Sequence, residues 1–137
     1  MIDRFDGATA ARWTPYAQAA LRIMAALLFL AHGVQKFFGF PAPSERGTVQ
    51  LFSFMGLAGT LELVGGLLLL VGLFTRPVAF LLSGMMAVAY FMAHAPRSVF
   101  PILNGGEPAI LFCFIFLFLC MAGPGAWSLD AARHRRP

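Results

Sequence analysis

Four long apolar stretches, separated by short groups of polar and turn-forming residues, dominate the pattern of hydrophobic and polar positions along this chain. They cover about residues 16–38, 54–74, 77–95 and 108–122. A helix needs about 20 apolar residues to cross a hydrocarbon core of about 30 Å, because each residue adds about 1.5 Å. The pattern therefore predicts an all-α fold, an integral membrane four-helix bundle that forms a single domain over residues 1–137.

The connections between the stretches are short. Thr75, Arg76 and Pro77 predict a tight turn between the second and third spans, with Pro77 at the first position of the third helix. The fourth apolar run is only about 15 residues long, a length at which a re-entrant or buried segment becomes an alternative to a full span. Trp127 can extend this span to the opposite interface as an aromatic anchor.

The composition narrows the class of protein further. Hydrophobic residues make up 59% of the 137 residues and charged residues 12%, whereas soluble domains are nearer half apolar and a quarter charged. This balance argues against a soluble globular domain, a disordered chain and a disulfide-stapled secreted module. We therefore expect the lipid bilayer as a partner and no nucleic acid.

The formal net charge of +4 is distributed unevenly, and this asymmetry predicts an orientation. Basic residues are enriched on the cytoplasmic side of membrane proteins. Seven lie at one end of the predicted bundle and three at the other, so we expect a plasma (inner) membrane protein with both termini in the cytoplasm. The seven are Arg4, Arg12, Arg22, Arg76, Arg133, Arg135 and Arg136, and the three are Lys36, Arg46 and Arg97. We expect no removable signal peptide.

Three polar residues of the first two spans share nearly the same depth in the outer half of the membrane. Glu62 shares a helix face with Gly59 and Gly66, and such small residues let a neighbouring helix approach closely. His32 and Lys36 are four residues apart on one face of the first span. A charge within a span is costly unless it is paired, so we predict a Lys36–Glu62 ion pair with His32 beside it. The alternative is that Lys36 snorkels to the outer interface and that Glu62 is neutral or bonded to a backbone carbonyl.

Three further polar residues lie near the same outer end. His94 ends the third span, while Asn104 and Glu107 precede the fourth. The sequence from Asn104 to Pro108 predicts a turn in which Glu107 caps the following helix. These three join His32, Lys36 and Glu62 as candidate ligand-binding residues, although an interface position or a helix cap also explains each of them. No residue is assigned a catalytic role.

Metal, thiol and haem chemistry have little support in the sequence. Cys113 and Cys120 are seven residues apart, about 10 Å along a helix, which is too far for a disulfide. We find no closely spaced set of His, Cys and carboxylate ligands, so we expect no metal site. A haem between His32 and His94 is disfavoured because their predicted depths differ by several ångströms.

Several stretches carry a family resemblance: His32-Gly33 with Lys36, Glu62 with Gly65-Gly66, Asn104-Gly105-Gly106-Glu107, and Gly123-Pro124-Gly125-Ala126-Trp127-Ser128-Leu129-Asp130. Together they resemble the DoxX family of small four-span membrane proteins, over about residues 21–130. The resemblance implies an all-helical four-span bundle associated with membrane redox chemistry and with quinones. The last stretch also has a structural explanation, with Trp127 as an interface anchor and Ser128 as the cap of a short basic helix.

Two functions remain open. The first is a quinone- or small-lipophile-binding component of a membrane redox system with an oxidoreductase partner protein. His32 and Lys36 would donate hydrogen bonds to a carbonyl, Glu62 would exchange a proton, and Asn104 with Phe and Met side chains would complete an outer-leaflet pocket. The second is a non-catalytic subunit whose polar cluster fixes helix packing and whose surfaces hold a partner protein. Solute transport is disfavoured because we find no broken helix or chain of ionisable residues across the bundle.

Overall fold

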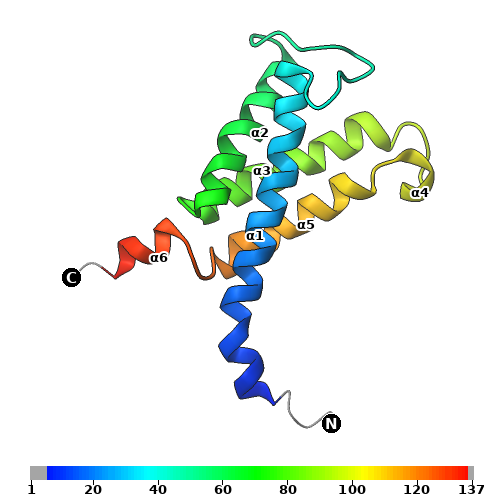
Figure 1. Cartoon of the computed structure of the whole chain (residues 1–137). Helices are drawn as coiled ribbons and strands as arrows, with labels where there is room; N and C mark the ends of the chain where they lie inside the picture. The colour runs from blue at the N-terminus through cyan, green and yellow to red at the C-terminus, as the bar shows by residue number, and fades with distance from the viewer. Residues whose placement is uncertain (1–5, 136–137) are drawn as a thin grey trace.

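The computed structural model describes residues 6–135, and the chain is helical throughout this range apart from loops and turns (Figure 1). The predicted all-α fold is therefore confirmed. Arg4 and Arg136, two of the basic residues behind the predicted orientation, lie outside the described residues. The helices are α1 (Gly7–Phe38), α2 (Phe54–Val71), α3 (Thr75–Ala89), η2 (Tyr90–His94), α4 (Pro101–Asn104), α5 (Glu107–Ala122) and α6 (Leu129–His134).

The helices form two hairpins. α1 packs along α2, and α3 packs along α5, while fewer contacts join one hairpin to the other. In Figure 1 the hairpins meet where α2 leads into α3, and they separate towards the loop 39–53 on one side and α4 on the other. The bundle is thus open at the end that carries most of the candidate residues.

The hydrophobic core lies where the two hairpins meet. It contains small and aromatic side chains of α1, a leucine of α2, and larger side chains of α3 and α5: Ala25, Ala26, Phe29, Leu69, Ala79, Leu82, Met86, Phe112, Phe116 and Leu119. Within the first hairpin, glycines allow α1 and α2 to approach closely. A Cβ atom at Gly66 would lie 2.7 Å from Leu30 Cγ, so the expectation that this glycine serves packing is confirmed.

The lengths of the helices fit a membrane protein. Among the described residues, three helical stretches are long and apolar enough to cross a membrane: α1, α2 and the continuous stretch Thr75–His94. α5 has 16 residues and is apolar but shorter. Its length agrees with the weak fourth stretch in the sequence.

Two helices begin earlier than their apolar spans, and the predicted position of Pro77 is wrong. α1 begins at Gly7 rather than near residue 16, because the Asp6 side chain caps it by accepting a hydrogen bond from the Thr9 N–H at 2.7 Å. The turn between α2 and α3 lies at residues 72–74 rather than 75–77, so Pro77 occupies the third helical position and not the first. α3 starts early because the carboxylate of Asp130, far along the chain, accepts the N–H groups of Phe74 and Thr75.

Candidate functional site

A cavity of about 850 Å³ lies between the two hairpins. Its wall is largely apolar and contains phenylalanine and methionine side chains of α3 and α5, such as Phe80, Met86 and Phe112. This agrees with the apolar wall predicted from the sequence. Four of the six candidate residues line the cavity: His32, Lys36, Glu62 and His94.

Lys36 and Glu62 form an ion pair in this wall, so the predicted pairing is confirmed and the snorkelling alternative is wrong. The Glu62 side chain is buried, and its Oε2 atom has no hydrogen-bond partner among the described residues. Glycines on both helices make room for the pair. A Cβ atom at Gly33 would lie 3.1 Å from Glu62 Cβ, and one at Gly59 would lie 3.5 Å from Lys36 Cδ. The pair therefore depends on the close approach of α1 and α2.

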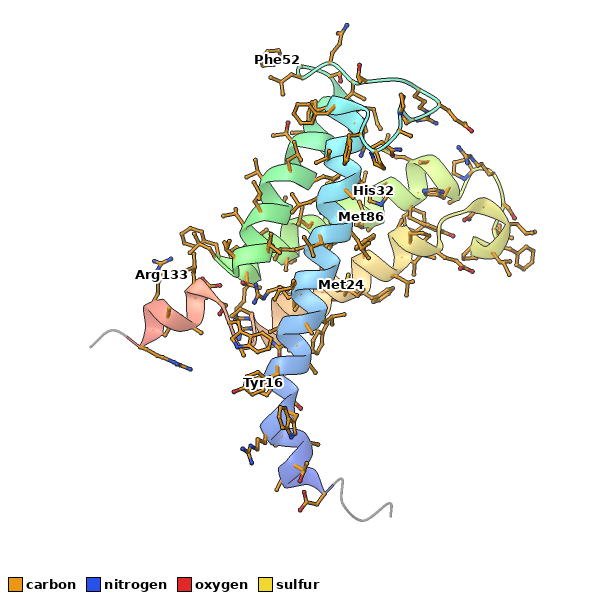
Figure 2. The ribbon with its side chains drawn as sticks, in the orientation of Figure 1. Tyr16, Met24, His32, Phe52, Met86 and Arg133 are labelled. Carbon is orange, nitrogen blue, oxygen red and sulfur yellow. The ribbon has the colours of Figure 1, made fainter. Side chains whose placement is uncertain are left out.

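His32 lies one helical turn before Lys36 and faces the second hairpin. Its ring meets that of Phe112 edge-to-face, with 6.2 Å between the ring centroids. Figure 2 shows His32 on α1 and Met86 on α3, and both residues line the cavity. The structure gives His32 no hydrogen bond to the ion pair, so His32 stands beside the pair with its ring nitrogens available to a ligand.

His94 and Asn104 meet at the end of the second hairpin that carries α4, but only His94 lines the cavity. Nδ1 of His94 lies 3.0 Å from the carbonyl oxygen of Asn104, and the His94 ring stacks on Tyr90. The buried Asn104 amide donates to Ser98 O and Tyr90 Oη and accepts from the Gly106 N–H at 2.7 Å. The prediction that Asn104 lines the pocket is wrong, because hydrogen bonds with Tyr90, Ser98 and Gly106 occupy its side chain.

Glu107 is also outside the cavity. It is the first residue of α5 and is exposed, while Gly106 occupies the N-cap position with no side-chain cap. The prediction that Glu107 caps this helix is therefore wrong. The Asn104 side chain already holds the Gly106 N–H, which places Glu107 in the first helical turn. There its negative charge is favourable beside the positive end of the helix dipole.

The buried Arg22 has a structural role that the sequence did not reveal. This side chain is fully buried, and its three nitrogens donate hydrogen bonds of 2.7–3.1 Å to five backbone carbonyls. These carbonyls belong to Leu69, Leu70, Pro124, Ala126 and Trp127. Arg22 thus ties the end of α2 to the segment after α5. A lone arginine within an apolar span was the available signal, because such a charge needs several partners.

The segment 123–130 adds further hydrogen bonds at the closed end of the bundle, where α2 leads into α3. We call these bonds, together with those of Arg22, the clasp. The Asp130 carboxylate accepts hydrogen bonds of 2.9 Å from the N–H groups of both Phe74 and Thr75. Burial would raise the pKa of Asp130, but the hydrogen bonds from Thr75 and Phe74 outweigh it and hold the pKa below its ordinary value. Ser128 accepts from the Ala131 N–H at 3.1 Å, so its predicted role as the cap of α6 is confirmed.

The thiols and potential metal ligands are dispersed. Cys113 and Cys120 are both free, and only Cys113 lines the cavity. Ser83 donates a hydrogen bond to the carbonyl oxygen of Cys113 at 2.8 Å. Within residues 6–135, no three His, Cys, Asp or Glu side chains come together as a metal site would require.

Comparisons with known proteins show which proteins the chain is similar to. The DoxX family model matches residues 17–95, which include all four candidates that line the cavity. The "Uncharacterized protein" of Haemophilus influenzae is 45% identical over 123 residues, covering 87% of this chain and 92% of its own. The "Inner membrane protein YqjF" of Escherichia coli is 29% identical, with 84% and 90% covered. The "Putative oxidoreductase CatD" of Bacillus subtilis is 28% identical, with 80% and 81% covered. No solved structure matches the chain.

Proposed function

This chain belongs to the DoxX family of membrane proteins, and on that premise we propose that it binds a quinone or a similar small lipophile between its two hairpins. The observation that carries the proposal is the cavity of about 850 Å³ beside the Lys36–Glu62 pair. Pockets for small molecules have volumes of about 300–1,000 Å³ and combine an apolar wall with a few polar groups. The cavity has this size and this composition.

The polar groups of the wall fit a ring that carries carbonyl or hydroxyl oxygens. The Lys36 ammonium and a His32 ring N–H are hydrogen-bond donors, and His94 adds another ring. The unpartnered Oε2 of Glu62 is an acceptor, or a donor when the carboxyl group is protonated. A quinone supplies carbonyl acceptors when oxidised and hydroxyl donors when reduced. Lys36 and His32 would hold such a carbonyl, and Glu62 would take up or release the accompanying proton.

The comparisons support a redox setting for this site. The Bacillus subtilis relative is named "Putative oxidoreductase CatD", and the sequence similarity to it extends over 80% of this chain. In this proposal the protein is a component of a membrane redox system, with an oxidoreductase as its partner protein. The cavity supplies the lipophile-binding site of that system.

A non-catalytic structural subunit is the second candidate, and one observation favours it. Lys36 and Glu62 neutralise each other, and the glycines around them fit the pair to the contact between α1 and α2. A cluster of this kind can fix helix packing without a ligand. The two candidates differ in their response to a change at Glu62.

The first experiment compares Glu62→Gln with Glu107→Gln. Both variants lose one carboxylate, but Glu107 is exposed and outside the cavity, which makes it a matched control. Quinone affinity is measured by titrating the purified protein in detergent with a short-chain ubiquinone. Loss of a hydrogen bond to a charged group costs about 1.5–3 kcal/mol, so Glu62→Gln should weaken binding about 10- to 150-fold. A folded Glu62→Gln protein with the affinity of the parent favours the structural subunit.

The two thiols provide an independent measurement of occupancy. Cys113 lines the cavity and Cys120 does not. Bound quinone should therefore slow the alkylation of Cys113 by a maleimide while the rate at Cys120 stays unchanged. Equal rates at Cys113 with and without saturating quinone contradict binding in this cavity.

We further propose that the protein lies in the inner membrane with both termini in the cytoplasm, supported by the name of the Escherichia coli relative and by the basic asymmetry. Thr14 and Thr48 are exposed near opposite ends of α1, so cysteines introduced there report the two sides. In a background without Cys113 and Cys120, an impermeant reagent added outside should label Thr48→Cys and spare Thr14→Cys. The reverse pattern overturns the orientation.

A further inference from the structure

A second pocket of about 500 Å³ lies at the closed end of the bundle, away from the candidate site. It is lined by residues that connect α2 to α3 and by residues of α6, among them Phe74, Arg76, Asp130 and Arg133. Figure 2 shows Arg133 on α6, which projects sideways from this end of the bundle. No candidate residue from the sequence lies in this pocket, and the quinone proposal does not use it.

The two arginines, Arg76 and Arg133, bring positive charge and unused hydrogen-bond donors to the pocket. Arg76 uses one nitrogen, Nη1, for the carbonyl oxygens of Cys120 and Met121, and its Nε and Nη2 have no partner among the described residues. The Arg133 guanidinium lies 5.1 Å from the ring centroid of Phe74 and forms no ion pair within the described range. His134 adds a third basic side chain to the lining.

The acidic residue in the pocket, Asp130, forms no salt bridge with an arginine of the described range, although the nearby Arg133 charge acts on its carboxylate. Each oxygen of the Asp130 carboxylate accepts a backbone N–H, one from Phe74 and one from Thr75, both at 2.9 Å. Both carboxylate oxygens of Asp130 are thus used to hold the start of α3. Nε and Nη2 of Arg76 and the guanidinium nitrogens of Arg133 have no hydrogen-bond acceptor among the described residues, so they can donate to an external anion.

The pocket lies at one end of the apolar helical surface, which in a membrane protein is the level of the lipid headgroups. The apolar helices α2 and α5 end at Val71 and Ala122, and α3 begins at Thr75, so the pocket lies where the apolar surface stops. Trp13, Tyr16 and Trp127 form a row of exposed aromatic rings, with centroid distances of 5.8 and 5.3 Å. Tryptophan and tyrosine gather at the membrane–water interface, so this row places the same end of the molecule at headgroup depth.

From these observations we infer that the pocket binds the phosphate of an anionic phospholipid headgroup. Arginine donates in a planar fork that matches phosphate oxygens, and two arginines around one cavity can hold a single phosphodiester. The exposed side chains of Phe80 and Met121 continue from this end along the apolar faces of α3 and α5, where acyl chains can lie. Basic pockets between helices at the cytoplasmic side are suited to anionic lipids, which are enriched in that leaflet.

The test titrates the purified full-length protein in detergent with short-chain phosphatidylglycerol and, separately, with short-chain phosphatidylcholine. The site variant is Arg76→Gln/Arg133→Gln. The matched control, Arg12→Gln/Arg135→Gln, removes the same charge from the same end of the molecule but from outside the pocket. Each basic residue near an anionic lipid contributes enough for about a fivefold change in affinity, so the site variant should bind phosphatidylglycerol about thirtyfold more weakly. The control should change by less than about threefold, since its charges lie farther from the headgroup.

Arg76 also donates hydrogen bonds to carbonyls at the end of α5, so its replacement could disturb folding as well as lipid binding. The single variant Arg133→Gln separates the two effects. Arg133 has no hydrogen bond among the described residues, so Arg133→Gln alone should weaken phosphatidylglycerol binding about fivefold. Its thermal stability should change little, because the change removes only the contact with the Phe74 ring and a charge near Asp130. Equal affinity of the parent for both lipids overturns the inference, and so does an equal loss in site and control variants. Displacement of phosphatidylglycerol by millimolar inorganic phosphate also overturns it, because the site would then belong to a soluble anion.

Discussion

Replacing Arg22 by methionine should destabilise the bundle more than any other single change at its closed end. Arg22 is fully buried and donates five hydrogen bonds that join α1 to α2 and to the segment after α5. Methionine keeps a long flexible apolar side chain at the position, so the change removes the donors and leaves little empty volume. The five carbonyls then remain without their partner.

The expected cost follows from those bonds. A hydrogen bond contributes about 1 kcal/mol net to stability, and more when one partner is charged. Five bonds therefore give about 5 kcal/mol, and water that enters the end of the bundle reduces the loss to about 3 kcal/mol. Arg22→Lys should lose about 2 kcal/mol, because an ammonium group has three donors and can satisfy at most three of the five carbonyls.

Equilibrium unfolding in mixed micelles of SDS and a mild detergent measures these free energies. Arg12→Met is the control, since Arg12 is exposed on the same helix and its replacement should change stability by less than about 0.5 kcal/mol. Trypsin gives a second readout, because release of the segment 123–135 should speed cleavage after Arg133. If Arg22→Met is as stable as the parent and equally resistant to trypsin, the five hydrogen bonds do not hold the clasp together.

Three further predictions concern the ion pair, the clasp and the cavity. Single replacement of Lys36 or Glu62 by methionine should each destabilise the protein more than the double replacement does, because a lone buried charge is costlier than none; additive losses in a double-mutant cycle would contradict this. The lowered pKa of Asp130 means that its contribution to stability is complete above the unfolded value of 3.8 and is lost as the pH falls below that value through the folded pKa. Unfolding measured between pH 6 and about pH 3 should therefore show a steeper loss for the parent than for Asp130→Asn, and equal slopes would refute the assignment. Gly84 lines the cavity and a Cβ atom there would meet nothing within 4 Å, so Gly84→Leu should fill the site and abolish lipophile binding while Gly84→Ala retains most of it; unchanged binding in Gly84→Leu would exclude this cavity.

The amino-acid sequence by itself determined the class of the fold and the partner of the Glu62 carboxylate. Apolar stretches of membrane-spanning length leave the backbone no stable option but helices, so the spans were placed to within a few residues at most ends. The Lys36–Glu62 pair was predictable because a buried charge requires a partner, and few side chains of opposite sign lie at the same depth. The length of a span and the depth of a charge within it can both be read from positions along the chain, so these two features were predictable.

Only the tertiary structure decided which polar groups face the cavity and which are occupied by the fold. Asn104 and Glu107 follow His94 along the hairpin connection, yet hydrogen bonds occupy the Asn104 amide and Glu107 is exposed outside the cavity. Arg22 bonds carbonyls that are 47 to 105 positions away in the chain. Because every residue carries a backbone carbonyl, the sequence does not indicate which carbonyls a buried arginine will bond. That choice, like the angle at which the hairpins separate, is set by how the helices pack against one another.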